Sequence, residues 1–232
     1  MNYDYLNIAK ATTSNKFLIK RYNEKPDSFS FKYIILEPFL KLHYKIFNFL
    51  YHKRPWTSPG SILFFEKALN KNMIGLEYGS GNSTLFFAIK FNKLISIEHN
   101  SEWYKKVKRN LEENKISNVD YFLFQKEDHP ESNENLDIYL NEHDEYESKE
   151  SYRKYYDKIK EYPNNYFDFI LIDGRARVRC GLNSISRLKK GGIFVLDNSE
   201  RKRYKPLLSA LDAWPKVNTT NGRTNTTIWI KP

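Results

Sequence analysis

The feature that most constrains this chain is a glycine turn within residues 73–84. An apolar run from Met73 leads into Glu77-Tyr78-Gly79-Ser80-Gly81-Asn82-Ser83-Thr84, and Leu85–Ile89 then continues at helix-like spacing. This order predicts a strand, a sharp turn and a helix. Two glycines permit such a turn and leave room for a ligand beside the exposed N–H groups of the helix's first turn. The pattern predicts a nucleotide-like ligand at this junction.

A second acidic residue, Glu98, lies at a position where it could bind such a ligand. It directly follows the next apolar run, Leu94–Ile97. It follows the turn by roughly 20 residues, the separation at which an acid binds ribose hydroxyls in nucleotide-binding α/β folds. The turn and Glu98 together predict a nucleoside-cofactor site.

The length and composition favour one catalytic-type domain. A chain of 232 residues can bury one α/β core with an appendage, and no Gly/Ser/Pro-rich linker divides it. We expect residues 1–55 to form an N-terminal arm and a helical extension packed on the core, and residues 56–232 to form the domain. The single cysteine, Cys180, excludes an internal disulfide and a cysteine-based zinc cluster.

Charge and hydropathy bear on location and partners. The sequence has no signal-like segment and no stretch that stays uncharged long enough to span a bilayer, so we expect a soluble, cytoplasmic protein. The net charge of +10 favours anionic partners, although solubility alone also explains it. Within the extension, Tyr33–Tyr51 has apolar residues near helical spacing. This segment predicts a helix packed on the core, with a membrane-surface helix as the alternative.

Strands and helices alternate along the rest of the chain, which predicts a parallel sheet. An acidic, asparagine-rich excursion at residues 126–165 interrupts the alternation. It predicts a lid or substrate loop, and a disordered insertion is the alternative. Near the C-terminus, Asn221-Gly222 separates two short runs and predicts a β-hairpin. The expected strands are Met73–Tyr78, Leu94–Ile97, Val119–Phe124, Tyr166–Ile172, Gly192–Leu196, Lys216–Thr220 and Thr224–Ile230, and the expected later helices include Arg177–Leu188 and Pro206–Trp214.

From about Trp56 onward the sequence resembles the class I S-adenosylmethionine-dependent methyltransferases. The turn and Glu98 carry this resemblance, together with Ile172-Asp173-Gly174 at the end of the fourth strand, Gly191-Gly192 and the terminal hairpin. It implies an α/β fold with a doubly wound, mostly parallel seven-stranded sheet, closed by an antiparallel hairpin that dehydrogenases generally lack. One position departs from the family pattern, because Ser83 stands where the motif usually has a third glycine.

The resemblance also implies roles in binding S-adenosylmethionine. Glu98 would accept hydrogen bonds from the ribose hydroxyls. Glu77 would receive the cofactor's ammonium group or brace the glycine turn. His99 would act as a base or pack over the adenosine. The residues that the resemblance assigns to the cofactor are Glu77, Tyr78, Gly79, Ser80, Gly81, Ser83, Glu98, His99 and Asp173.

Acidic and amide side chains end two neighbouring strands of the expected sheet. Asp173 and Asp197-Asn198 would open onto one crevice and offer hard ligands for Mg²⁺ or Mn²⁺. This resembles the metal-dependent O-methyltransferases of the catechol and caffeoyl-CoA type, although the cationic run from Arg175 to Arg179 disfavours a nearby divalent ion. Asp173, Asp197 and His99 are the catalytic candidates. A strand-end acid that caps the next helix is the alternative for Asp173.

The arginines that follow these strands point to the acceptor. Arg175, Arg177 and Arg201 would clamp an anionic group, or else form a solvated basic rim. We therefore expect methyl transfer to an oxygen or nitrogen of a small, anionic or sugar-like acceptor. The alternatives are a nucleic-acid methyltransferase, a non-catalytic nucleotide-binding or scaffold protein of the same fold, and a nicotinamide-dependent oxidoreductase, which the hairpin disfavours.

Overall fold

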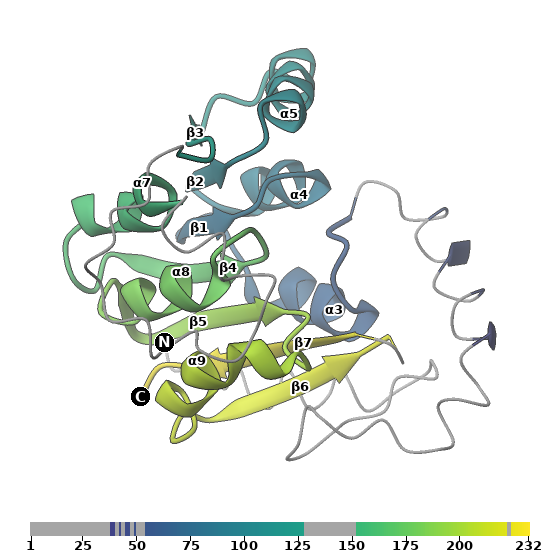
Figure 1. Ribbon diagram of the computed structural model, residues 1–232. Helices are drawn as coiled ribbons and strands as arrows, with labels where there is room; N and C mark the ends of the chain where they lie inside the picture. The colour runs from purple at the N-terminus through teal and green to yellow at the C-terminus, as the bar shows by residue number, and fades with distance from the viewer. Residues whose placement is uncertain are drawn as a thin grey trace.

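A computed structural model describes residues 54–127, 152–221 and 224–232, together with Pro38, Phe39, Leu42, Lys45, Ile46 and Phe49. Its centre is a seven-stranded sheet in the order β3-β2-β1-β4-β5-β7-β6 (Figure 1). The strands are β1 (Ile74–Tyr78), β2 (Lys93–Glu98), β3 (Val119–Leu123), β4 (Phe167–Ile172), β5 (Leu188–Asp197), β6 (Lys216–Thr220) and β7 (Asn225–Ile230). The helices are α3 (Pro59–Ala68), α4 (Asn82–Lys90), α5 (Ser101–Glu113), α7 (Arg153–Asp157), α8 (Arg177–Ser184) and α9 (Lys205–Ala210), with 3-10 turns η2 (Lys158–Glu161) and η3 (Lys202–Tyr204).

The pairing confirms the predicted fold class. Strands β1 to β5 pair in parallel, and β7 runs antiparallel to both β5 and β6. The chain moves outward from β1 to β3 and then returns to place β4 on the other side of β1. This reversal creates a switch point between β1 and β4, and ligands of open α/β sheets bind beyond the carboxyl ends of the strands at such a point.

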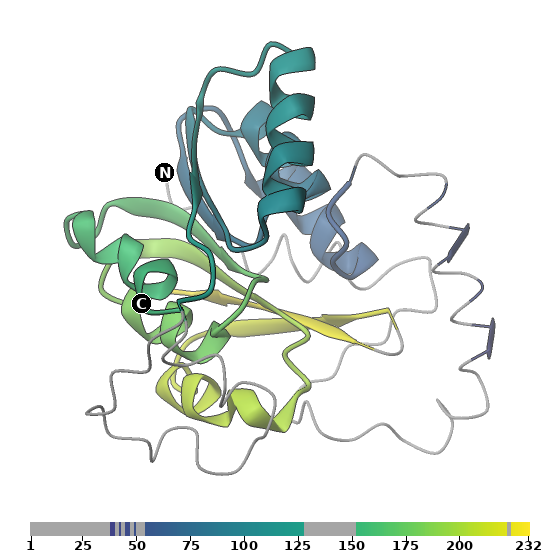
Figure 2. The ribbon, with the colours of Figure 1, turned by 45° about the horizontal axis from the view of Figure 1, so that its top comes forward.

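Helices cover both faces of the sheet, and a hydrophobic core lies under each layer (Figure 2). On one face, the phenylalanines of α3 and α4 pack on β4, with the rings of Phe65 and Phe87 at 5.6 Å and 4.9 Å from that of Phe169. On the other face, α7, α8 and α9 bury Tyr155, Val178 and Leu207. The central strands are therefore apolar on both sides, as buried parallel strands require.

One helix differs locally from the expectation. Helix α8 ends at Ser184 and not at Leu188, because Leu188 begins β5 and pairs with Phe167 of β4. Ser58 occupies the N-cap position of α3, but its side chain makes no cap hydrogen bond. Its hydroxyl instead bonds Thr219 of β6, so it ties α3 to the C-terminal hairpin.

The end of the 126–165 insertion belongs to the core. Tyr155, Tyr156 and Ile159 are buried against the sheet and form part of one hydrophobic cluster. Residues 128–151, and with them most of the predicted lid, lie outside the described part of the chain.

Most of the predicted N-terminal helix also lies outside the described part. The apolar side chains in it that the structure describes are 50–81% exposed, so its packing on the core stays a prediction: they are Phe39, Leu42, Ile46 and Phe49. Among the described residues, no helix combines the length and apolar character needed to cross a membrane.

Candidate functional site

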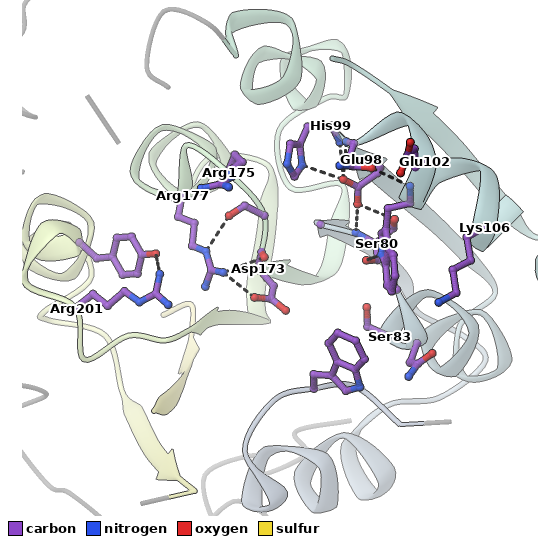
Figure 3. Close-up of a pocket in the computed structure, with 18 of the residues that line it drawn as sticks. Ser80, Ser83, Glu98, His99, Glu102, Lys106, Asp173, Arg175, Arg177 and Arg201 are labelled. Carbon is purple, nitrogen blue, oxygen red and sulfur yellow. Dashed lines mark hydrogen bonds and ion pairs between the residues drawn. The ribbon is translucent and has the colours of Figure 1, made fainter. Parts of the chain in front are cut away.

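A cavity of about 800 Å³ opens at the carboxyl ends of the parallel strands, beside the switch point. In Figure 3, Glu98 and Ser80 lie on one side of it, and Arg175, Arg177 and Arg201 lie on the other, with Asp173 between them. The residues that line the cavity come from the segment before α3, from α5, and from the ends of β1, β2, β4 and β5 with the segments that follow them. They are Trp56, Gly79–Ser83, Glu98–Asn100, Glu102, Trp103, Lys106, Asp173–Arg175, Arg177, Arg201, Arg203 and Tyr204.

The glycine turn is built around Gly79. This residue has φ +89°, in the left-handed region that favours glycine. A Cβ atom on it would lie 2.8 Å from backbone atoms of Asp173 and Gly174. The turn after β1 therefore rests directly on the end of β4. Gly81 differs, because its φ of 167° is extended and a Cβ there would meet only Trp103, at 3.6 Å.

Glu77 lies beneath this turn and does not line the cavity. Its carboxyl group is fully buried and accepts hydrogen bonds from Thr84 and, at 2.7 Å, from Ser96. The Thr84 hydroxyl in turn accepts a 3.0 Å hydrogen bond from the Gly81 N–H. Burial raises the pKa of Glu77 to about 7 despite these donors. Of the two predicted roles, this geometry favours bracing the turn.

Tyr78 also points away from the cavity. Its ring is buried 5.2 Å from the ring of Tyr155, and its hydroxyl donates to the backbone oxygen of Tyr156 at 3.1 Å. Only the backbone of Tyr78 adjoins the glycine turn.

Glu98 is the anionic centre of the cavity's first half. One carboxylate oxygen accepts hydrogen bonds from the N–H and hydroxyl of Ser80, at 2.8 and 2.7 Å. The other accepts from the N–H groups of His99 and Asn100, both at 2.8 Å. Burial opposes ionisation, but the donors from His99, Asn100 and Ser80 outweigh it and lower the pKa of Glu98 to about 2. Glu98 is therefore ionised at neutral pH.

His99 lines the cavity beside this carboxylate. Its Nδ1 lies 2.8 Å from Glu98 Oε1, and its ring packs edge-on against Tyr152 and Tyr155. The imidazole thus belongs to the same half of the cavity as the glycine turn.

Two tryptophans complete this half. The Trp103 Nε1 donates to the backbone oxygen of Ser80 at 2.6 Å, and the Trp56 ring lies 6.0 Å from the Trp103 ring. Trp103 was not predicted to belong to the site. An indole in the first turn after Glu98, with an N–H that needs a partner, is the signal that could have identified it.

Arg177 organises the second half. It is 8% exposed, and its guanidinium donates to the backbone oxygens of Asp173, Gly174 and Asp197. It also pairs with the Asp173 carboxylate at 2.8 Å. Arg177 therefore ties the ends of β4 and β5 together and holds Asp173 in place. Asp173 does not cap α8, whose N-cap residue is Ala176.

Both acids among the predicted metal ligands are already engaged by other side chains, Asp173 by Arg177 and Asp197 by Thr226. Asp197 is 4% exposed, does not line the cavity, and accepts a 2.6 Å hydrogen bond from Thr226 of β7. Burial, reinforced by the charge of Asp173, raises the pKa of Asp197 to about 8. A buried carboxyl of this kind and an Asp173 paired with Arg177 do not suit a divalent cation. In the described ranges, no three His, Cys, Asp or Glu side chains form a group that could hold a metal.

The structure therefore gives no support to Mg²⁺ or Mn²⁺ bound by Asp173, Asp197 and Asn198. Asp197 pairs in register with Thr226 of the neighbouring strand β7, and its side chain accepts the hydrogen bond from that residue. Because Asp197 does not line the cavity, it is not positioned to contact a substrate there.

Known proteins resemble this chain in fold. Comparisons with protein-family models and with curated proteins find no match. Among solved structures, a methyltransferase-like protein from Silicibacter pomeroyi is 20% identical over 69% of this chain and 79% of its own, with TM-score 0.47. A Streptococcus mutans protein in complex with SAH is 14% identical over 71% of this chain and 91% of its own, with TM-score 0.49.

The tRNA (m1A58) methyltransferase TrmI from Aquifex aeolicus is 13% identical over 71% of this chain, with TM-score 0.47. The match spans 64% of the Aquifex chain, which is less than two thirds of it. All three structures have TM-scores below 0.5 and identities of 20% or less.

Proposed function

We propose that this chain binds S-adenosylmethionine and transfers its methyl group to an oxygen or nitrogen of a small acceptor. The observation that carries the proposal is the position of the Glu98 carboxylate, which lines a cavity beside the Gly79–Gly81 turn. An acid after β2 and a glycine turn after β1 together form the nucleoside site of open α/β folds.

The residues present fit this cofactor. Glu98 would accept the ribose hydroxyls, and the backbone of Gly79, Ser80 and Gly81 would form the wall against which the cofactor lies. The Ser80 hydroxyl now bonds Glu98, yet it also has the Tyr121 hydroxyl at 2.6 Å. It can therefore turn to Tyr121 and leave an acceptor position of Glu98 to the ribose. When bound, the cofactor supplies an electrophilic methyl group on a sulfonium centre.

The protein itself contributes the alignment of the two reactants and a side chain that can accept a proton. Positioning of two reactants in one cavity removes much of the entropic cost of their encounter. Asp173 lies between the glycine turn and the arginines, and Arg177 fixes its carboxylate at 2.8 Å. We assign Asp173 to accept the proton of the acceptor's hydroxyl or amino group, or to bind the cofactor's ammonium group. His99 packs beside Glu98, so we assign it to the adenosine.

Calorimetric titration of the protein with S-adenosylmethionine, SAH and NAD tests this proposal. The first two should bind, and Glu98→Gln should weaken SAH at least about tenfold because it removes the charged acceptor of the ribose hydrogen bond. Glu102→Gln is the matched control, since Glu102 is an exposed acid that lines the same cavity. NAD binding without SAH binding would overturn the proposal, as would equal losses in the two variants.

A further inference from the structure

The half of the cavity opposite Glu98 is strongly cationic. Four guanidinium groups line it, against one carboxylate, Asp173, which already pairs with Arg177: they are Arg175, Arg177, Arg201 and Arg203. Arg175 follows β4 and Arg201 follows β5, so two separate chain segments bring these charges to one space (Figure 3). A concave site with excess positive charge attracts anionic ligands.

Arg177 and Arg175 have different roles, although they are only two residues apart in the sequence. Arg177 is buried and donates to the strand ends. Arg175 is exposed, and within the described part of the chain no side chain pairs with its guanidinium. Arg201 is also exposed, and its contacts are long: 3.5 Å to the Tyr204 hydroxyl and 4.0 Å to Glu200. The guanidinium groups of Arg175 and Arg201 therefore retain capacity to donate to a ligand.

Left-handed backbone occurs in both arginine-bearing turns. Ala176, directly after Arg175, has φ +46°, and Asn198, three residues before Arg201, has φ +52°. This conformation is tolerated by asparagine but is costly for alanine, and costly positions of this kind cluster where a site must be held in a fixed shape. The left-handed Ala176 lies between an arginine exposed to the cavity and an arginine buried beneath it.

We propose that this arginine-rich half of the cavity binds a phosphate group on the methyl acceptor, with Arg175 and Arg201 as its principal donors. The inference rests on the proposed function and names the acceptor's chemical class. Arginine donates in a fixed fork that matches phosphate oxygens. A phosphate carries close to two negative charges, so it balances this excess of guanidinium groups better than one carboxylate does. The cavity of about 800 Å³ must hold the cofactor as well, which limits the phosphorylated acceptor to a small molecule.

The test is calorimetry at low ionic strength on protein saturated with SAH. The probes are inorganic phosphate and matched pairs of compounds: glycerol and glycerol 3-phosphate, ribose and ribose 5-phosphate, glucose and glucose 6-phosphate. Glycerate provides a carboxylate arm. Inorganic phosphate and at least one ester should bind, the ester at least about tenfold more tightly than its parent alcohol and than glycerate.

Substitution of the two arginines tests whether they bind the phosphate ester. Arg175→Gln and Arg201→Gln should each weaken the ester about tenfold or more. Lys190→Gln is the matched control, because it also removes one positive charge. Lys190 is exposed near the start of β5, at the end of the strand opposite to the cavity. Losses no larger than that of the control contradict the inference.

The remaining outcomes separate this inference from the proposed function. If wild-type protein binds SAH but neither phosphate nor any ester, the phosphate inference fails and the cofactor assignment stands. Binding of a short RNA without binding of any ester also overturns it and favours a nucleic-acid acceptor. If phosphate esters bind while SAH does not, the acceptor site stands and the methyl donor is wrong.

Discussion

Replacement of Gly79 with alanine should destabilise the protein by several kcal/mol and abolish SAH binding. Two physical costs add at this position. The backbone is left-handed, which costs an alanine about 1 kcal/mol, and the new methyl group would lie 2.8 Å from the backbone of Asp173 and Gly174. Relief of that overlap must move the β1 turn away from β4, at a further cost of about 1–3 kcal/mol. Chemical denaturation measures the loss.

Alanine substitutions at two other glycines separate the backbone cost from the steric cost. Gly191 has φ +73° with no atom within 4 Å of its Cβ position, so Gly191→Ala should show the backbone cost alone. Gly81 is extended and has ordinary van der Waals room, so Gly81→Ala should change stability by less than about 0.5 kcal/mol. A Gly79→Ala variant no less stable than Gly191→Ala would show that the contact between the two turns is not close.

The second large effect concerns Glu77 and pH. Its ordinary pKa of 4.5 rises to about 7 in the folded chain, because burial disfavours the carboxylate. Between these values the folded state holds a proton that the unfolded state has released. The free energy of unfolding must therefore fall as pH rises, by about 3 kcal/mol for this group from about pH 4.5 to about pH 8.

Glu77→Gln removes this titration. The free energy of unfolding of this variant minus that of wild type should therefore increase by about 3 kcal/mol over the same pH range. A pH-independent difference caused by the amide does not change this increase. Denaturant unfolding of both proteins at several pH values measures the difference. Asp197, whose pKa is also raised, contributes equally to both curves and cancels. A difference that stays constant with pH would show that Glu77 does not carry a raised pKa.

Local patterns predicted most of the sheet. The predicted strand, turn and helix of residues 73–89 and the predicted Asn-Gly hairpin agree with β1, α4, β6 and β7, because both predictions rest on short-range backbone preferences. The end of α8 was less predictable. Residues 185–188 keep an apolar spacing compatible with a helix, and only the pairing of Leu188 with Phe167 assigns that position to a strand.

The candidate site was predictable in outline and not in its contacts. Glu98 and Asp173, both expected at the ends of strands, line one cavity. Asp197 does not line it, and its partner Thr226 comes from a strand whose position depends on the whole fold. Arg177 could not be distinguished from Arg175 in the sequence, since its acceptors are backbone oxygens that exist only where β4 and β5 end together.

A crystal structure of the protein with SAH tests the central claim most directly. The account predicts SAH in the cavity, with its ribose hydroxyls within hydrogen-bond distance of the Glu98 carboxylate and its amino-acid portion beside the Gly79–Gly81 turn. Its sulfur should face Asp173 and the arginine-rich half. SAH bound at another place, or with its ribose away from Glu98, would contradict the assignment of this cavity to the methyl donor.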